Sequence, residues 1–325
     1  MPGKSSFEMR ENVEDGVISV WMVNYNSSAF VAECLVTLLD PSIGRIAILD
    51  NGSQPNDLIC LRALEHKDPR VVVYESTTNV GFGSGINMIS RLEKGWKNEY
   101  IWILNPDTRV VLGNPAELAS LLERTDYQIV SPTITTGPLN DMKVWFAGGT
   151  YDVANGTCSH TGFGSSLSSA VVDHYATQFM TGAAPLMRTK TWELLGGFSE
   201  SLFLYWEDVD LSLRAHDLGL KMGVCSSVVV WHHEGGSGGI SEGHSSAYYY
   251  YMNRNRVVVC TPRSSIFSVV VSRGARETVR LLLQPLSITQ PNRLAKFVSA
   301  FHGLSSGILV SIFGPLRSLR GHTSA

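Results

Sequence analysis

The sequence predicts an α/β fold in which a doubly wound, mostly parallel sheet is flanked by helices and followed by a basic helical appendage. Three observations lead to this prediction. Strand-like and helix-like segments alternate through the first hundred residues. The strand-like segments are continuous apolar runs, as buried parallel strands are. The charge is also divided, because residues 254–325 hold ten Arg and Lys and one acid, whereas the 325-residue chain has a net charge of −3.

Apolar runs bounded by turn residues predict the strands, and apolar residues at helical spacing predict the helices between them. In chain order we expect strand 17–23, helix 28–39, strand 45–49, helix 57–66, strand 70–74, helix 84–92 and strand 100–104. A Gly-, Ser- and Thr-rich middle, 130–182, has shorter strand candidates. The later elements expected are helix 189–195, helix 208–218, strand 221–230 and amphipathic stretches around 266–283 and 294–313.

The composition excludes several classes of protein. With 44% apolar and 17% charged residues, the chain has a core to bury and is not disordered. The net charge of −3 argues against a general nucleic-acid binder. Five scattered cysteines without a C-x-x-C pair predict neither a disulfide framework nor a zinc knuckle, and they favour a reducing compartment. The polar N-terminal tail, 1–16, lacks the apolar core of a secretory signal, so we expect a cytoplasmic protein.

Polar clusters follow three of the predicted strands, at 24–26 (NYN), 50–53 (DNGS) and 105–107 (NPD). In sheets of this type ligands bind beyond the carboxyl ends of the strands. A carboxylate at Asp50 could accept the N3–H of uracil or thymine, although an isolated Asp-Asn-Gly is more often an Asx turn. Asp107 could hold a divalent cation that bridges diphosphate oxygens, or it could cap its own turn.

The segment 79–87 (NVGFGSGIN) follows a strand and opens a helix. Its glycines would allow a phosphate or sugar to approach the backbone, and the helix N-terminus favours an anion. A tight strand-to-helix turn explains the same glycines equally well.

Two further clusters carry titratable groups. Residues 207–210 (EDVD) begin a predicted helix after the aromatic residues 203–206. Asp210 is spaced to pair with Arg214, which leaves Glu207 or Asp208 free to act as a base, whereas simple N-terminal helix charge is the default explanation. His232 and His233 end a strand before a glycine loop, and imidazole there could bind a metal or a diphosphate.

Seven motifs in this order resemble the family-2 glycosyltransferases of the GT-A fold, in particular their rhamnosyltransferase-like branch. They are VNYNSS (23–28), LDNGS (49–53), NVGFGSGIN (79–87), LNPDT (104–108), TGAAPLMR (181–188), GGFSESLFLYWEDVDLSLR (196–214) and HHEGGS (232–237). The resemblance covers about 17–251. It implies a GT-A domain at 17–250, with a nucleotide-binding half (17–110) and an acceptor and catalytic half (111–250), followed by a basic region at 251–325.

The resemblance also implies roles for single residues. Those matching Asn24, Asp50 and Asn79 contact the nucleotide in that family, Asp107 binds the metal and Asp208 is the catalytic base. Asn105 stands where many relatives carry a second acid. His232 matches a histidine near the metal and diphosphate, with His233 as the rival candidate. The wider candidate set adds Tyr25, Asn26, Asn51, Ser53, Gly81, Phe82, Gly83, Asn87 and Asn105 for the nucleotide, Glu207 for catalysis, and Trp206, His233 and Gly182 for the acceptor and diphosphate.

The implied activity is inverting transfer of a sugar, with rhamnose as one candidate, from a dTDP- or UDP-sugar to a glycan or polyprenyl-linked hydroxyl in cell-envelope polysaccharide synthesis. Mg²⁺ or Mn²⁺ would be the cofactor. Apolar stretches interleaved with arginines in the basic tail suit an interfacial helix on an anionic leaflet, and hence a peripheral position on the inner face of the membrane. A helical subdomain packed on the core, or a homo-oligomer contact, would explain the same stretches.

Three rival functions are considered. A sugar nucleotidyltransferase would carry a Gly-rich loop with Arg or Lys after Val23, and that loop is missing. A non-catalytic sugar-nucleotide-binding protein at the membrane would not need the Glu207–Asp208 pair. A glycosidase would need two carboxylates but no diphosphate site.

Overall fold

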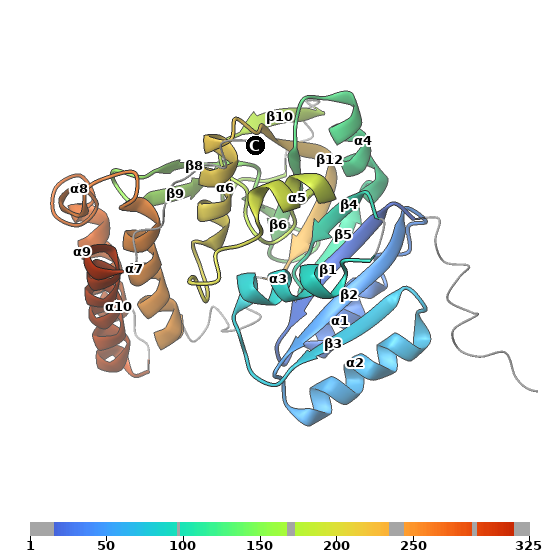
Figure 1. The fold of residues 1–325 in the computed structure, drawn as a ribbon, viewed down its shortest axis with the longest axis horizontal. Helices are drawn as coiled ribbons and strands as arrows, with labels where there is room; N and C mark the ends of the chain where they lie inside the picture. The colour runs from blue at the N-terminus through green and yellow to red at the C-terminus, as the bar shows by residue number, and fades with distance from the viewer. Residues whose placement is uncertain (1–15, 96–97, 168–172, 234–243, 288–290, 315–325) are drawn as a thin grey trace, which may run out of the picture. The chain divides into compact units, whose positions relative to one another are not determined.

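The computed structural model describes residues 16–95, 98–167, 173–233, 244–287 and 291–314 (Figure 1). The chain divides into two compact units. Unit 1 is Met1–Tyr151 with Cys158–Ser241, and unit 2 is Asp152–Thr157 with Glu242–Ala325. Residue 250, where the sequence analysis placed a domain boundary, lies inside a helix that belongs to unit 2. All five cysteines lie among the described residues, and none of them forms a disulfide there.

Unit 1 is built on a ten-stranded sheet with the order β10-β12-β6-β11-β4-β1-β2-β3, in which β5 also pairs with β12 and β7 with β6. The strands are β1 (Ile18–Asn24), β2 (Ile43–Asn51), β3 (Val71–Ser76), β4 (Tyr100–Ile103), β5 (Thr108–Leu112), β6 (Ile129–Thr136), β7 (Lys143–Phe146), β10 (His174–Thr177), β11 (Leu186–Arg188) and β12 (Met222–His232). Strands β8 (Gly149–Asp152) and β9 (Thr157–His160) form a separate two-stranded sheet.

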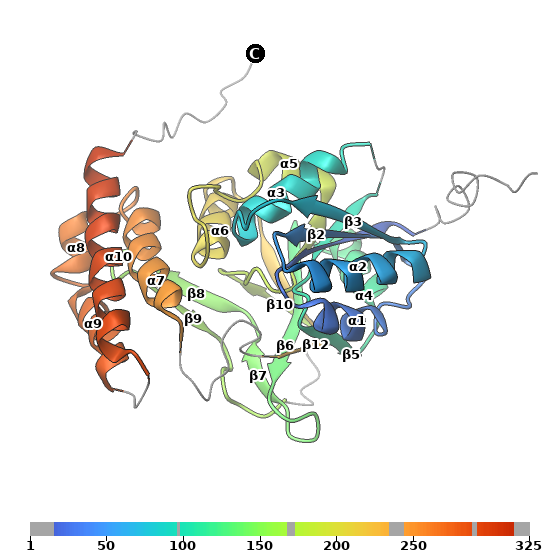
Figure 2. The same ribbon diagram turned by 90° about the horizontal axis from the view of Figure 1, so that it is seen from below.

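Helices lie on both faces of this sheet (Figures 1 and 2). They are α1 (Ser28–Leu35), α2 (Pro55–Lys67), α3 (Phe82–Leu92), α4 (Pro115–Arg124), α5 (Thr189–Leu195) and α6 (Glu207–Asp217). Figure 2 shows α3 and α5 on one face and α1, α2 and α4 on the other. The doubly wound α/β architecture that the sequence predicted is therefore confirmed.

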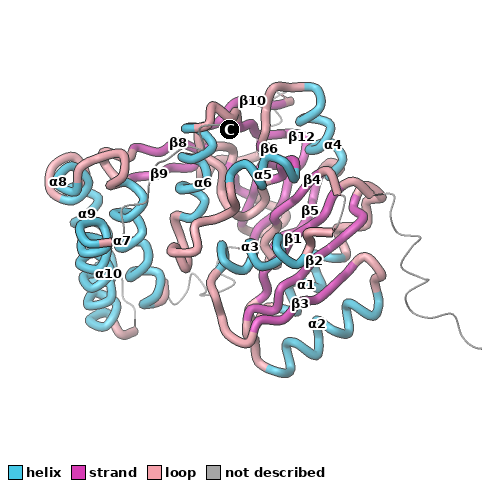
Figure 3. Tube along the Cα trace, in the orientation of Figure 1, coloured by secondary structure: helices cyan, strands magenta, loops and turns pink. Residues whose placement is uncertain are grey.

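The parallel part of the sheet contains the strands that the sequence analysis recognised. β2 pairs in parallel with β1 and β3, and β1 pairs in parallel with β4. Every residue of β1 is buried, which explains its uninterrupted apolar run because both faces of the strand are covered. The antiparallel pairings, such as β11 with β4 and β5 with β12, involve strands that follow residue 107. Figure 3 traces the strands of both parts in magenta.

Two expected elements differ from the structure. Helix α1 ends at Leu35 rather than at residue 39, because the chain turns there and Thr37 Oγ1 donates to the Cys34 carbonyl oxygen at 2.7 Å. The stretch 266–283 is not one helix. It consists of α8 (Ile266–Val270) and α9 (Ala275–Ser287), and the chain between them turns so that the Gly274 amide donates to the Ser268 carbonyl oxygen at 2.8 Å.

Unit 2 contains α8 and α9 together with α7 (Ser246–Cys260) and α10 (Arg293–Phe313). Helix α10 packs on α7 through glycines. A Cβ at Gly303 would lie 2.1 Å from the Tyr250 carbonyl oxygen, and one at Gly307 would lie 2.6 Å from that of Arg254. The two backbones thus approach each other more closely than any larger residue would allow.

A buried arginine joins the parts of unit 2. The guanidinium of Arg256 is fully buried. It donates to the carbonyl oxygens of Val269 (3.1 Å) and Asn155 (3.4 Å) and to Thr278 Oγ1 (2.5 Å). Burial lowers its pKa. One side chain therefore ties α7 to α8, to α9 and to the turn between β8 and β9.

Replacement of this arginine is expected to destabilise the protein strongly. Arg256→Met would keep much of the side-chain volume but leave two buried acceptors and one part-buried acceptor without their donor, so we expect a loss of about 3 kcal/mol in the free energy of unfolding. Urea denaturation followed by circular dichroism measures this loss. Arg276→Met, at an exposed position of α9, is the control and should change the free energy of unfolding by no more than about 0.5 kcal/mol. Equal stability of the two variants would contradict the role given to Arg256.

Candidate functional site

Polar side chains meet at the carboxyl ends of β1 and β2. The Asn24 amide nitrogen donates to Asp50 Oδ1 (3.1 Å), Ser53 Oγ (3.2 Å) and Asp57 Oδ2 (2.7 Å). Its Oδ1 accepts bonds from the Ser27 amide and hydroxyl at 3.2 and 2.9 Å. Asn24 is fully buried. Its amide is therefore used within the protein, where it orients Asp50, and its contact with a nucleotide stays a prediction.

Asp50 keeps acceptor capacity for a ligand. It is buried, and its Oδ2 accepts the Ser53 amide at 3.2 Å, whereas a carboxylate can accept about four hydrogen bonds. Asp57 was missed by the sequence analysis. Its Oδ1 accepts the Ser28 amide (2.9 Å) and hydroxyl (2.6 Å), and although burial alone would raise the pKa of Asp57, these bonds and the one from Asn24 lower it. The available signal was an acid in the first turn of α2, a position that helix charge explains without a site.

Two asparagines hold the loop before α3. The Asn51 amide nitrogen donates to Asn79 Oδ1 (3.0 Å) and to the Gly81 carbonyl oxygen (3.3 Å). In return the Val80 amide donates to Asn51 Oδ1 at 2.9 Å, and the Gly81 amide donates to Asn79 Oδ1 at 2.9 Å. These side chains shape the loop, so a nucleotide would meet a fixed backbone rather than a free asparagine.

The glycines of this loop serve the protein's own packing. Gly81 has a φ of 88°, and a Cβ there would lie 2.2 Å from the Phe203 carbonyl oxygen, to which the Phe82 amide donates at 3.2 Å. A Cβ at Gly83 would lie 2.8 Å from that of Phe198. The turn alternative thus accounts for both glycines. The same contacts bring the loop against the segment that precedes α6.

The start of α6 holds two carboxyl groups behind a strained backbone. Tyr205 and Trp206 both have positive φ values, 66° and 70°, which non-glycine residues adopt at a cost of about 1 kcal/mol each. Asp208 follows, and its Oδ2 accepts the Gly182 amide at 3.2 Å. Among the residues that the structure describes, Trp206 Nε1 and Glu207 Oε2 are buried without a hydrogen-bond partner. Unsatisfied polar atoms in a strained turn are typical of a ligand site rather than of a structural one.

Burial changes the ionisation of the two acids. Burial, together with the neighbouring Asp208 charge, raises the pKa of Glu207 to about 8. Burial also raises the pKa of Asp208, to about 6, although the hydrogen bond from the Gly182 amide opposes this. Glu207 is therefore protonated when Asp208 ionises, and the repulsion that adjacent carboxylates would exert on each other is removed at neutral pH. Asp208 can act as a base while Glu207 stays neutral.

Asp107 and His232 form a pair at the other side of the site. Asp107 Oδ1 lies 3.2 Å from His232 Nε2, and both side chains are about one-tenth exposed, at 12% and 11%. The pairing of β5 with β12 brings them together, and the His233 amide donates to the Asp107 carbonyl oxygen at 2.9 Å. The His233 ring instead packs against Phe30, with centroids 5.0 Å apart. Of the two histidines that the sequence left open, His232 is the one that faces Asp107.

A short segment links this pair to the acids of α6. The Asn105 amide donates to the Ala183 carbonyl oxygen at 2.9 Å, and the neighbouring Gly182 amide donates to Asp208. Gly182 is also closely packed, because a Cβ there would lie 3.1 Å from the Phe82 ring, which would have to shift slightly. Residues 182 and 183 therefore hold the turn of Asp107 on one side and Asp208 on the other.

The pair could supply two ligands to a divalent cation. Among the described residues, no group of three or more His, Cys, Asp or Glu side chains is placed to hold a metal ion. A carboxylate and an imidazole still suit a hexacoordinate ion whose other ligands are diphosphate oxygens and water. His232 Nδ1 is buried without a partner in the described part of the chain, so a ligand could also engage it. Asp107 and His232 therefore fit a divalent cation whose remaining ligands come from the bound diphosphate and from water.

Trp145 is an aromatic residue of the site that sequence reasoning missed. Its ring lies edge-to-face with those of His232 (centroids 5.0 Å apart) and His160 (4.7 Å). Nothing in the sequence signalled this contact, because Trp145 is on β7 and 87 positions separate it from His232. The indole packs against the imidazole that faces Asp107.

Other candidates lie elsewhere or are already engaged. Asn87 donates to the Phe198 carbonyl oxygen (2.8 Å) and accepts the Phe198 amide (2.9 Å), so it ties α3 to the segment before α6, and its nucleotide contact stays a prediction. Asn26 Oδ1 accepts the Gln54 amide at 2.8 Å. Tyr25 is half exposed beyond β1 and remains available to a ligand. The glycine loop after His233 lies outside the described residues.

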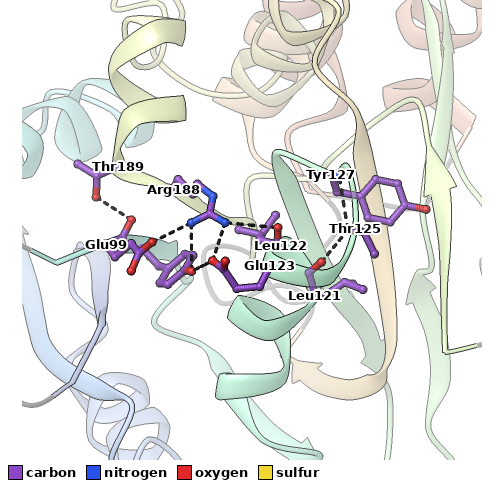
Figure 4. A network of polar contacts seen from close by, with 9 residues as sticks. Glu99, Leu121, Leu122, Glu123, Thr125, Tyr127, Arg188 and Thr189 are labelled. Carbon is purple, nitrogen blue, oxygen red and sulfur yellow. Dashed lines mark hydrogen bonds and ion pairs between the residues drawn. The ribbon is translucent and has the colours of Figure 1, made fainter.

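A second polar network lies at the opposite ends of the strands (Figure 4). Arg188, the last residue of the motif 181–188, donates to Glu99 Oε1 (2.8 Å), Tyr100 Oη (3.2 Å) and Glu123 Oε1 (2.5 Å). Tyr100 begins β4, whereas Asp107 follows the end of that strand. This network therefore fastens the sheet at the edge away from the candidate site.

Comparison with known proteins gives one family and several relatives. A family model described as "Glycosyl transferase family 2" matches residues 19–188. The protein described as "Low-salt glycan biosynthesis hexosyltransferase Agl10", from Haloferax volcanii, is 25% identical over 311 residues, which cover 94% of this chain and 92% of that protein.

Three solved structures match most of this chain. The crystal structure of GalNAc-T7 with UDP, GalNAc and Mn²⁺ has a TM-score of 0.54 at 13% identity, and the match covers 90% of this chain but only 57% of that one. The mannosyltransferase PcManGT from Pyrobaculum calidifontis, in complex with GDP-Man and Mn²⁺, has a TM-score of 0.49 at 13% identity, with 92% and 76% covered. TarS 1-349 from S. aureus has a TM-score of 0.48 at 15% identity, with 90% and 80% covered.

Proposed function

The chain belongs to glycosyltransferase family 2, and from this premise we propose that it transfers a sugar from a nucleoside diphosphate to a hydroxyl group with inversion at the anomeric carbon. The observation that carries this proposal is the junction at residues 182 and 183, which connects the Asp107–His232 pair to Asp208. Donor and acceptor would meet there. Similarity to a glycan-biosynthesis hexosyltransferase supports a hexose as the sugar and a glycan as the product.

The proposed donor is a dTDP- or UDP-linked sugar, with rhamnose as one candidate. Asp50 supports this choice, because its free acceptor sites suit the N3–H of thymine or uracil. Tyr25 lies directly after β1, the strand that pairs with β2 beside Asp50, and is exposed, so it could cover the base. UDP and dTDP differ by one methyl group on the base, and the donor screen below separates them.

The proposed mechanism is a single displacement. Asp208 takes the proton from the acceptor hydroxyl while that oxygen attacks the anomeric carbon. The bond from that carbon to the diphosphate breaks on the opposite face, and the nucleoside diphosphate leaves with the electron pair. Protonated Glu207 leaves Asp208 as the single charged carboxylate of the two. Mg²⁺ or Mn²⁺, bound by Asp107 and His232, would neutralise charge on the leaving diphosphate.

The proposed acceptor is a glycan or a polyprenyl-diphosphate-linked sugar, and the proposed location is the inner surface of the cell membrane. The basic region after residue 254 supports this placement, because anionic lipids attract arginine and lysine. Cell-envelope polysaccharide synthesis is the process that would need such an enzyme.

A screen of nucleotide sugars tests the function. UDP-, dTDP- and GDP-sugars with Mg²⁺ or Mn²⁺ are assayed by thermal shift, because binding raises stability by mass action. Donors that bind are then tested for release of nucleoside diphosphate with an acceptor glycan, and NMR of the product gives its anomeric configuration. Retained configuration would contradict the mechanism. Donor binding accompanied by neither sugar transfer nor slow donor hydrolysis would instead indicate a non-catalytic sugar-nucleotide-binding protein.

The pH dependence of transfer tests the assignment of the two acids. We expect kcat/KM to fall about tenfold per pH unit below pH 6, because Asp208 must be ionised and its pKa is raised to about 6. Glu207→Gln should leave this limb unchanged, since Glu207 keeps its proton up to about pH 8. A shift of the limb in Glu207→Gln would show that the order of ionisation is reversed.

The stability of the same variant provides a second measurement. The folded pKa of Glu207 is raised from 4.5 to about 8, so the folded state holds a proton that the unfolded state has released between these pH values. The free energy of unfolding of the wild type should therefore fall as the pH rises from 4.5 to about 8. Glu207→Gln should gain stability relative to the wild type from pH 5 to pH 8, which urea denaturation at several pH values measures.

A further inference from the structure

Helix α10 turns its large apolar side chains outward. Its α7-facing side carries small residues, and Ala300, Gly303 and Gly307 are buried there. Its other side exposes Leu294, Val298, Phe301, Leu309, Ile312 and Phe313, each by more than half. A helix of a water-soluble bundle normally buries such residues and exposes polar ones. Here the arrangement is reversed.

Helices α8 and α9 extend this apolar surface with basic residues beside it. Val279, Leu283 and Leu286 are spaced along one side of α9 and are exposed by 53, 49 and 38%. Arg276 and Arg280 lie on the same exposed side. Phe267 of α8 and Val271 after it are exposed by 65 and 57%. We call these exposed side chains of α8, α9 and α10 the apolar face of unit 2; Figure 2 shows the three helices close together.

This face exposes eleven large apolar side chains, those of α10, α9, Phe267 and Val271 given above. Soluble monomers expose contiguous apolar patches of only a few hundred Å², and larger ones mark contact with a protein or a membrane. The charged residues around the face indicate whether a protein or a membrane covers it. Arg273, Arg276, Arg280 and Arg293 are all exposed next to it. Unit 2 has two acids among its described residues, of which Glu277 pairs with Arg280 and Asp152 ends β8. In a twofold dimer the same patch would meet itself, so arginines would face arginines.

An anionic lipid surface would contact both the exposed apolar side chains and the arginines around them. Lipid tails accept the apolar side chains, and the headgroups attract the arginines.

The contacts between α10 and α7 indicate whether α10 would lie in the plane of the membrane or cross it. In the described part of the chain, α10 is the one helix long and apolar enough to span a bilayer. However, its hydroxyl groups bond to α7, from Tyr250 Oη to Ser306 Oγ (3.2 Å) and from Thr261 Oγ1 to Ser311 Oγ (3.0 Å), and Lys296 is buried. Spanning would require these contacts to break.

We propose that the apolar face of unit 2 docks on an anionic bilayer, with α10 lying in the plane of the headgroups rather than across the membrane. The inference rests on the membrane placement in the proposed function, and it specifies the surface, the lipid charge and the orientation. Large side chains of α10 and α9 enter the acyl region, and the arginines of α9 contact the headgroups.

Vesicle flotation tests the proposal with the full-length protein. Vesicles of phosphatidylglycerol and phosphatidylcholine should carry the protein upward, whereas pure phosphatidylcholine should carry at least about tenfold less. The double variants Phe301→Ser/Leu309→Ser and Arg273→Glu/Arg276→Glu should each lose at least about tenfold in partition to the anionic vesicles. Leu39→Ser/Leu112→Ser is the matched control, because both leucines are exposed apolar residues of unit 1, and it should bind like the wild type.

Each other outcome overturns the proposal. If the wild-type protein does not float with the anionic vesicles, the face is not a membrane contact. The same conclusion follows if the control variant loses as much binding as the variants of the face. A dimer in light scattering that Phe301→Ser/Leu309→Ser dissociates would identify a second copy as the occupant. Protease protection of the residues after α10 in sealed vesicles would indicate a spanning helix. Transfer to a water-soluble acceptor should persist in all these variants, so failure of the docking and failure of the glycosyltransferase function are measured separately.

Discussion

Asp208→Asn is expected to lower kcat for sugar transfer by about 10³-fold while leaving the affinity for the nucleotide sugar unchanged. The substitution keeps the size of the side chain and an oxygen that can accept the Gly182 amide, so the local structure should hold. It removes the group that takes the acceptor proton. Rapid-quench or steady-state transfer assays measure kcat, and calorimetric titration of the donor measures its binding.

The control for this variant lies two residues further along the same helix. Asp210 pairs with Arg214 at 3.0 Å, which makes it a structural acid at the start of α6. Asp210→Asn should therefore lower stability and leave kcat close to that of the wild type. Normal turnover by Asp208→Asn, or an equal loss in Asp210→Asn, would remove Asp208 from the mechanism.

Asp107→Asn is expected to weaken Mn²⁺ binding by about 10- to 100-fold and to lower kcat/KM by about 10²-fold. Asparagine keeps the size of the side chain, so the arrangement beside His232 should hold while the negative charge is lost. Calorimetric titration of Mn²⁺ in the presence of the nucleoside diphosphate measures the binding without any turnover. Higher Mn²⁺ concentrations should restore part of the activity.

Asp141→Asn provides the comparison, because Asp141 is an exposed acid of unit 1 that pairs with Lys143. It should bind Mn²⁺ as the wild type does. If the wild type transferred sugar at full rate in excess EDTA and Asp107→Asn did the same, the proposed metal site would be excluded.

Most of the parallel half of the fold could be predicted from the sequence. Apolar runs such as 17–23 are recognisable because a strand covered on both faces admits no polar alternation. The predicted helix 189–195 agrees with α5, Thr189–Leu195. The break between α8 and α9 could not be predicted, because the amphipathic spacing continues through the turn and only the backbone hydrogen bonds reveal it.

The site could be predicted as a set of clusters but not as a set of contacts. The pairing of Asp210 with Arg214 was visible because helix geometry relates residues four apart. The commitment of Asn87 to Phe198 was not, because 111 positions separate the two residues. Asp57 and Trp145 were missed for the same reason, since each joins the site through partners distant in the chain.

By itself, then, the sequence determined the order of the elements, the polar clusters at the strand ends and the basic charge of the last part, because these depend on residues close to one another in the chain. Only the tertiary structure decided which polar groups remain available to a ligand, since Asn24 and Asn87 are engaged by distant residues. It also decided that His232 faces Asp107 and that Glu207 holds its proton. Hydrogen bonding, burial and pKa are set by neighbours in space, and chain folding chooses those neighbours.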